Sequence, residues 1–271
     1  MSEHAEAAVT AAPAPPPQEP AAPRRTLYRR RFTIIYAILG LVVLAASAGL
    51  VVAALGSGVG TSGPAWSSWR PGGGGLGAAR QVGDHVAPQY RLPNGKQLVD
   101  VITKAPSISA GNQTIPVHYL AVRGTHGAAD QIFSVSSSDT VMFSLCGLGQ
   151  SCAIATGKAS VARGRLVRRE ILELALYTFK YVGGIKNVVA FMPPAPGASP
   201  QYVVYLRRDD LAPELSSPLA VTLHSKTPLP NTISAKEVRL VDAATESRYF
   251  SFSLAQGQQG DAILVLATPP S

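Results

Sequence analysis

Charge is scarce in this chain, and one long stretch lacks it altogether. Asp, Glu, Lys and Arg make up 15% of the 271 residues, and none occurs in residues 32–62. Aromatic residues make up 7%, with two tryptophans, and there are two cysteines. Two cysteines are too few for a disulfide-rich scaffold or a multi-cysteine zinc module. The motifs Gly-x-Ser-x-Gly and His-Glu-x-x-His are absent too, so no signature of a serine hydrolase or zinc protease is present.

Two glycine-containing segments fail as nucleotide-binding loops. Gly147-Leu148-Gly149 begins like a dinucleotide loop, but Cys152 stands where glycine or alanine is required. Gly157-Lys158 resembles the end of a phosphate loop, but Ala159 follows where serine or threonine is required. The sequence therefore predicts no cofactor.

The histidines and acids form no catalytic or metal-binding pattern. Asp209-Asp210 follows a predicted strand, where the two acids either serve as acid and base or cap the next segment. We predict no catalytic residue and no metal site. The histidines considered, each isolated in sequence, are His85, His118, His126 and His224.

The charge-free stretch predicts a transmembrane helix over residues 32–55. At 1.5 Å per residue it is about 36 Å long, enough to cross an apolar bilayer core of about 30 Å with some tilt. Five arginines precede it and no Lys or Arg follows before Arg70, so the positive-inside rule places the N-terminus in the cytoplasm and the C-terminal part outside. The alternative is a cleaved export signal, with Arg-Arg-Arg-Phe at residues 29–32 and an Ala-Ser-Ala cleavage site at residues 46–48. The apolar run continues to residue 55, which favours the anchor.

The chain divides into four predicted parts. Residues 1–31 are a disordered cytoplasmic tail rich in Pro, Ala and Arg, residues 32–55 the transmembrane helix, residues 56–75 a Gly/Ser linker and residues 76–271 one extracytoplasmic domain. Trp66 and Trp69 interrupt the linker, and either rest at the membrane interface or cap the domain core. Ala45, Gly49 and Ala53 form a small-residue stripe that suits helix pairing, although an alanine-rich segment produces such stripes by chance.

The exported part carries most of the positive charge. From Gly63 onward there are 19 basic and 13 acidic side chains, within a net charge of +8 for the whole chain. This excess either attracts acidic partners or only keeps the domain soluble. The predicted partners are the lipid bilayer, and then an anionic envelope polymer or another membrane protein. Nucleic acid is excluded, because the basic region lies outside the cell.

The exported part is predicted to be an α+β domain with a mostly antiparallel sheet and one long amphipathic helix. The long helix covers residues 165–182, with Arg165, Arg169, Glu173 and Lys180 facing away from its apolar stripe. Ser234 is expected to cap a short helix reaching residue 241. A hairpin is expected around Asn94-Gly95. Shorter elements are a helix at 76–86 and strands at 90–92, 97–102, 115–122, 131–135, 140–146, 187–192, 201–207, 249–254 and 262–267.

Cys146 and Cys152 are predicted to form a structural disulfide, as is typical of an isolated cysteine pair in an exported domain. The alternatives are free thiols or redox chemistry. A redox pair usually has the spacing Cys-x-x-Cys at a helix start, which is absent here.

Arg163, Arg165, Arg168 and Arg169 form the densest basic run of the domain, at the start of the long helix. A helix N-terminus surrounded by arginines suits an anion, so these four are the candidate anion-binding residues. The alternative is a solvated helix face with an Arg169–Glu173 pair.

The architecture resembles uncharacterised single-pass membrane proteins of high-GC bacteria. The resemblance covers the arginine-rich leader, the apolar segment, Trp-Ser-Ser-Trp-Arg-Pro at residues 66–71 and Arg-Arg-Glu-Ile-Leu-Glu-Leu-Ala-Leu-Tyr-Thr at residues 168–178. It implies no activity. The expected function is a membrane-anchored extracytoplasmic binding module of the cell envelope. The alternatives are an envelope hydrolase and a structural subunit of a membrane complex.

Overall fold

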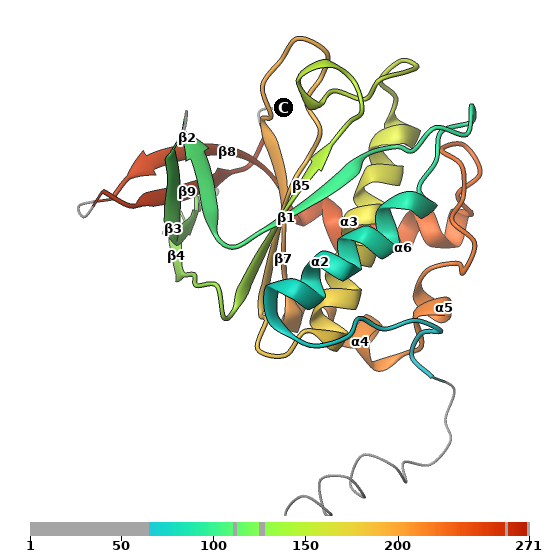
Figure 1. The fold of residues 1–271 in the computed structure, drawn as a ribbon, viewed down its shortest axis with the longest axis horizontal. Coiled ribbons are helices and arrows are strands. Elements are labelled where there is room, and N and C mark those ends of the chain that lie inside the picture. Colours follow the sequence, from blue (N-terminus) through green and yellow to red (C-terminus); the bar gives the residue numbers. More distant parts are fainter. Residues whose placement is uncertain (1–64, 111–112, 125–127, 258–259, 270–271) are drawn as a thin grey trace, which may run out of the picture. The chain divides into compact units, whose positions relative to one another are not determined.

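The computed structural model describes residues 65–110, 113–124, 128–257 and 260–269 (Figure 1). All of them belong to the second of two compact units, Pro64–Ser271. This unit contains both helices and strands. The predicted tail, the predicted transmembrane segment and the stripe of Ala45, Gly49 and Ala53 lie outside the described residues.

The longest described helix is α3, Val161–Tyr181, which begins at a serine cap. Ser160 accepts a hydrogen bond from the Arg163 backbone N–H, so the helix begins four residues before the predicted start at residue 165. Ser234 caps α6 by accepting from the Glu237 N–H, as predicted. The other α-helices are α2, Gly75–Val86; α4, Ala212–Ser216; α5, Leu219–Thr222; and α6, Ala235–Thr245. Short 3₁₀ turns lie at Ala87–Gln89, Gln150–Cys152, Arg208–Leu211 and Glu246–Arg248.

Nine strands of the described chain form one sheet in the order β1-β5-β6-β7-β8-β9-β3-β2, with β4 paired to β3. Two pairings, β5 with β6 and β3 with β9, are parallel, and the other six are antiparallel. The strands are β1, Asp100–Lys104; β2, Ser107–Ala110; β3, Gln113–Val122; β4, Gln131–Ser134; β5, Thr140–Cys146; β6, Asn187–Phe191; β7, Tyr202–Arg207; β8, Tyr249–Gln256; and β9, Ala262–Ala267.

The parallel pairing of β5 with β6 explains the place of α3. Parallel neighbours need a crossover connection, and α3 carries the chain back across the sheet between them. The apolar run Val141-Met142-Phe143 in β5 is typical of a strand buried on both faces, and it is buried here on both.

Two apolar cores lie on opposite faces of the central strands. Val141 and Phe143 of β5 point into the core under α2, α3 and α6, whereas Met142 between them points into a second core with residues of β3 and β9. β6 and β7 alternate in the same way. The helices cover the first face of the sheet (Figure 1).

The predicted architecture of a transmembrane helix followed by an α+β domain is wrong for the chain that the structure describes. None of the helices in the described ranges is long and apolar enough to cross a membrane. The described fold is a mixture of helices and a sheet with parallel as well as antiparallel pairings. The expectation of a mostly antiparallel sheet agrees with six of its eight pairings. The sequence did not reveal the two parallel pairings, because periodicity reports burial and not strand direction.

The predicted outward face of α3 is wrong at Arg169 and Glu173, whereas Lys180 is exposed as expected. Arg169 is fully buried and Glu173 is 7% exposed. The helix packs against α2 on one side and α6 on another, so its polar stripe is covered as well as its apolar one. A stripe of charge on a helix indicates solvent only when nothing else packs on it.

The expected hairpin at Asn94-Gly95 forms a turn without two full strands. Gly95 has a positive φ of 79°, as the turn requires, but the ladder is a single bridge between Arg91 and Gln97. Backbone hydrogen bonds still join the two sides, from Leu92 to Lys96 and from Leu98 to Tyr90, and Tyr90 and Leu98 are fully buried in the first core.

Candidate functional site

The first described segment, residues 65–74, lies against α2 and α3 through its two tryptophans. The ring of Trp66 meets Tyr177 and Tyr181 edge-on, with centroids 5.6 Å apart in both pairs. Trp69 stacks on His85 at 3.9 Å and meets Tyr177 edge-on at 5.5 Å. Of the two interpretations of these tryptophans, the structure therefore places them on the domain core.

Hydrogen bonds hold the same segment in place. The Ser67 hydroxyl pairs with the Tyr181 hydroxyl at 2.7 Å and donates to the Trp69 carbonyl. The backbone N–H of Leu219 donates to the Trp66 carbonyl at 2.7 Å. The segment is thus fixed to α3 and to α5.

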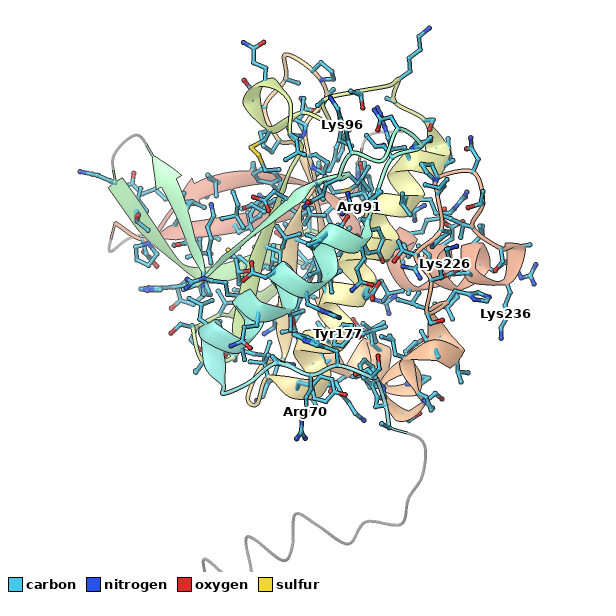
Figure 2. The ribbon with its side chains drawn as sticks, turned by 45° about the vertical axis from the view of Figure 1, so that its right-hand side comes forward. Arg70, Arg91, Lys96, Tyr177, Lys226 and Lys236 are labelled. Carbon is cyan, nitrogen blue, oxygen red and sulfur yellow. A yellow bond between two sulfur atoms is a disulfide. The ribbon has the colours of Figure 1, made fainter. Side chains whose placement is uncertain are left out.

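A cavity of about 570 Å³ lies beneath this segment. Trp66 and Ser67 border it from the segment, His85 from α2, and Tyr177 and Glu173 from α3. Residues 218–220 and 223–225 complete the wall. In Figure 2, Tyr177 lies inside the domain, whereas Arg70 extends outward. Glu173 is the one Asp, Glu, Lys or Arg among the lining residues. The volume and the mixture of aromatic and polar groups are typical of a small-molecule site.

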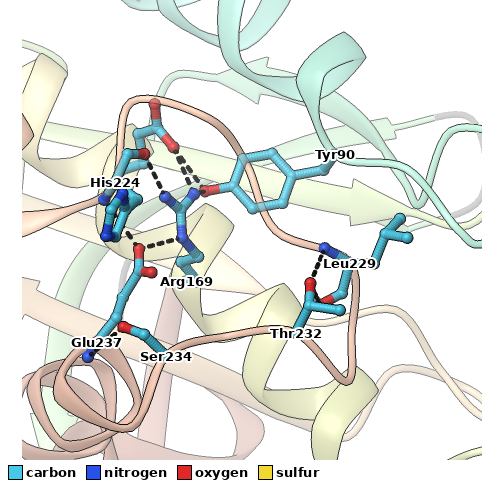
Figure 3. A network of polar contacts seen from close by, with 8 residues as sticks. Tyr90, Arg169, His224, Leu229, Thr232, Ser234 and Glu237 are labelled. Atoms are coloured by element: carbon cyan, nitrogen blue, oxygen red, sulfur yellow. Dashed lines mark hydrogen bonds and ion pairs between the residues drawn. The ribbon is translucent and has the colours of Figure 1, made fainter.

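Glu173 belongs to a buried network centred on Arg169, whose contacts with Tyr90, His224 and Glu237 are shown in Figure 3. The Arg169 Nη1 atom lies 3.1 Å from Glu173 Oε2 and donates to the Tyr90 hydroxyl, which itself donates to Glu173 Oε2 at 2.6 Å. Arg169 Nε donates to Glu237 Oε1 at 2.7 Å, and Nη2 to the His224 carbonyl at 2.9 Å. Each of the three guanidinium nitrogens therefore has a hydrogen-bond partner, as a buried charge requires.

The network contains two carboxylates and one guanidinium. Burial raises the pKa of Glu173, although Arg169 and Tyr90 oppose the rise. Burial disfavours the charge on Arg169, but Tyr90, Glu173 and Glu237 outweigh it and raise its pKa. Arg169 thus stays a cation, and the network is negative when both carboxylates are ionised.

The aromatic walls of the cavity are uncharged. Burial lowers the pKa of His85 below its ordinary value of 6.5, so its ring is mainly neutral at pH 7. Burial and the charge of Glu173 raise the pKa of Tyr177 to about 12. Glu173 is therefore the acidic residue whose ionisation places a negative charge on these walls.

A second carboxyl group, Glu170, is buried without a partner. It is fully buried, and both of its oxygens lack a hydrogen bond within the part of the chain that the structure describes. Burial first, and then Glu173 and Asp100, raise its pKa well above the ordinary value of 4.5. Burial thus favours the neutral form of the Glu170 carboxyl group.

The four arginines of the predicted anion site do not converge on one point. Arg165 and Arg168 both pair with Asp242 on α6, at 2.9 Å and 2.7 Å. Arg169 faces Glu173 and Glu237, and its predicted pairing with Glu173 is confirmed. Packing of α6 against α3 supplies carboxylates that the α3 sequence alone does not show.

Arg163 is placed differently from the other three. Its guanidinium donates to the carbonyls of Thr156 and Gly157 and borders a separate cavity of about 330 Å³. Lys158 is the other charged residue of that lining. Arg163 is therefore the one member of the predicted anion site that borders this smaller cavity.

The predicted disulfide between Cys146 and Cys152 is confirmed. It links the end of β5 to the turn Gln150–Cys152. Gly147 is required in this loop, because a Cβ atom there would lie 2.2 Å from the Ala153 carbonyl oxygen. The bond thus closes a tight loop and serves structure.

The other residues considered from sequence are dispersed. His118 lies 3.4 Å from Asp261, Asp210 pairs with Arg248 at 3.3 Å, and Asp209 lies 3.8 Å from Arg207. His126 lies outside the described residues. Within the described ranges no three His, Cys, Asp or Glu residues are grouped to hold a metal ion.

Sequence reasoning missed the cavity because its walls come from four separate segments. Glu173 carried a usable signal, since it lies between Leu172 and Leu174 in a helix that is apolar on both flanks. Tyr177 lies one helical turn further and shares the same face. Neither position indicates the tryptophans that cover them.

Comparison with protein-family models, with curated proteins and with solved structures finds no match for this chain.

Proposed function

We propose that Pro64–Ser271 is a ligand-binding module of the cell envelope that works outside the cytoplasm and does not alter its ligand chemically. The observation that carries the proposal is the cavity of about 570 Å³, walled by Trp66 and Tyr177 with Glu173 at its edge. The disulfide supports a compartment outside the cytoplasm, because such bonds persist under oxidising conditions.

The Ser67 hydroxyl and the His85 ring, which both border the cavity, already contact other residues, and this supports binding over catalysis. The Ser67 hydroxyl is bonded to Tyr181 and to a backbone carbonyl, and the ring of His85 is stacked on Trp69. A nucleophile and its base need to be within hydrogen-bond reach of one another. These two groups have other partners.

The cavity can be tested by blocking it. Ala220 is exposed and borders the cavity, whereas its neighbour Val221 is exposed and does not. We expect Ala220→Phe to abolish binding in the full chain, and Val221→Phe to preserve it. Tryptophan fluorescence reports binding, because the chain has two tryptophans and both lie in this region.

The panel for this test contains amines, amino acids, sugars, carboxylates and phosphates. At least one class should change the fluorescence of the wild type and of Val221→Phe, but not of Ala220→Phe. A panel in which no compound distinguishes Ala220→Phe from the wild type would remove the cavity as the binding site.

A second candidate is anion binding at the smaller cavity, favoured by its two positive lining residues, Lys158 and Arg163. Arg165 and Arg168 are unsuitable for testing it, because changing them to Glu would crowd Asp242 with like charge. We expect Lys158→Glu to weaken the binding of the full chain to phosphatidylglycerol vesicles, most strongly at low salt. Lys226→Glu is the matched control at another exposed lysine. Equal loss in both variants would mean that only net charge matters.

A further inference from the structure

The carboxylate of Glu173 has one oxygen in use and one available. Oε2 receives the Tyr90 hydroxyl at 2.6 Å and lies 3.1 Å from Arg169 Nη1. No donor among the described residues is bonded to Oε1, and this side chain is more than nine-tenths buried. Glu173 borders the large cavity. An unpartnered carboxylate oxygen at a cavity wall calls for a donor from the ligand.

The charge behind this wall is not balanced within the network. Arg169 is shared between Glu173 and Glu237. One positive charge therefore serves two carboxylates in a region shielded from water, where an unbalanced charge is costly. A cation in the cavity would complete the balance.

The rings around the cavity suit the same kind of ligand. Trp66 and Tyr177 both border it, and aromatic faces attract ammonium groups. Trp66 already accepts such a contact within the chain, since Lys180 Nζ lies 5.6 Å from its ring centroid. Lys180 does not border the cavity.

We propose that the ligand is an organic ammonium ion, whose positive group lies between Glu173 Oε1 and the rings of Trp66 and Tyr177. The inference rests on the proposed function and names the ligand class of the same cavity. The carboxylate supplies a charge-assisted hydrogen bond or close ionic contact, and the rings supply cation–π attraction. Leu219 and Leu223 also border the cavity and offer apolar contacts to the rest of the ligand.

Matched pairs of charged and neutral probes test the inference. Choline is compared with 3,3-dimethylbutan-1-ol, which has the same shape without charge, and benzylamine with benzyl alcohol. Binding to the full chain is followed by tryptophan fluorescence and by calorimetry. We expect at least one of the two cationic probes, choline or benzylamine, to bind about tenfold or more tightly than its neutral partner. Equal affinity within both pairs, or no binding by either amine, overturns the inference.

Two variants locate the charge that is responsible. Glu173→Gln keeps the shape and the acceptor and should reduce amine affinity about tenfold or more. Glu246→Gln is the same change at an exposed position outside the cavity and should bind as the wild type does. Unchanged affinity in Glu173→Gln overturns the inference.

A further variant covers the case in which Glu173→Gln does not fold. Trp66→Leu leaves the charge network untouched and removes one ring, so calorimetry should show weaker amine binding and little change for neutral probes. Equal losses for both kinds of probe count against an ammonium site.

The outcomes also separate the two proposals. If only neutral or anionic compounds bind and Ala220→Phe blocks them, the cavity is a binding site but the ammonium assignment fails.

Discussion

Arg169 is the largest side chain that is fully buried in the described part of the chain. Burial of a guanidinium is tolerated only when its donors and its charge are matched. Here two carboxylates, a tyrosine hydroxyl and a backbone carbonyl surround it. Each of these partners comes to α3 from another place in the sequence or from one turn along the helix. The residue therefore ties α3 to Tyr90, to α6 and to the chain at His224.

Replacing Arg169 by Met should be strongly destabilising. Glu173 and Glu237 would remain buried without their cation, which costs about 3 to 5 kcal/mol. Arg165→Met should cost about 1 kcal/mol or less, because Asp242 keeps Arg168 and the pair is partly exposed. Chemical denaturation of both variants measures the difference. Equal losses would show that the buried network has no special role.

Glu170 provides a prediction of pH dependence. Its folded pKa lies well above 4.5, so its contribution to stability is fully present below pH 4.5 and is lost as the pH rises toward the folded pKa. The charged groups that act on it are Glu173, Arg169 and Asp100. Glu170→Gln cannot ionise, so its free energy of unfolding relative to the wild type should increase above pH 4.5 by about 1.4 kcal/mol per pH unit until the folded pKa is reached.

Unfolding curves at a series of pH values measure this effect. Glu246→Gln, at an exposed site, is the control and should give a curve parallel to that of the wild type. A Glu170→Gln curve that is parallel as well would mean that the Glu170 carboxyl is hydrated or paired in solution.

At the scale of elements, α3 determines the arrangement of the domain. It forms the crossover between β5 and β6, and its apolar side chains belong to the first core. It also carries Glu173 and Tyr177, which line the cavity. The loop before it is closed by the disulfide between residues 146 and 152. A change in this loop therefore affects the connection that leads into α3.

Opening the disulfide should lower stability without unfolding the domain. The chain-entropy estimate for so short a loop is about 2 kcal/mol. We expect the double variant Cys146→Ser, Cys152→Ser to melt at a lower temperature than the wild type, and reductant to lower the wild type to the same level. Thiol labelling of unreduced native protein should modify neither cysteine. Rapid labelling of both would contradict the bond.

At the scale of the whole unit, the chain before α2 completes the fold. The predicted linker covered residues 56–75, but Trp66 and Trp69 pack against the first core. Their partners, Tyr177 and His85, would be exposed without them. Part of a stretch rich in Gly and Ser thus contributes to the described domain.

A chain that begins at residue 75 should be less stable than one that begins at residue 64. Loss of two half-buried tryptophans is expected to cost about 2 to 4 kcal/mol. The double variant Trp66→Phe, Trp69→Phe keeps aromatic packing and should lose less than the truncation. Thermal unfolding of the three proteins tests the order. Identical midpoints would mean that residues 65–74 do not stabilise the domain in solution.

The sequence by itself determined the local features of this protein. Helical spacing located α2 and α3, although α3 begins at Val161 and not at the predicted residue 165, and the Ser234 cap located α6. Alternating or continuous apolar runs located most strands, and two lone cysteines indicated their bond. These features depend on residues that are near one another in the chain. Only the tertiary structure determined that Arg169, Glu173 and Tyr177 are buried and that Trp66 packs against the core. Their burial depends on which distant segments pack on α3, and neither the period of a helix nor its charge pattern contains that information.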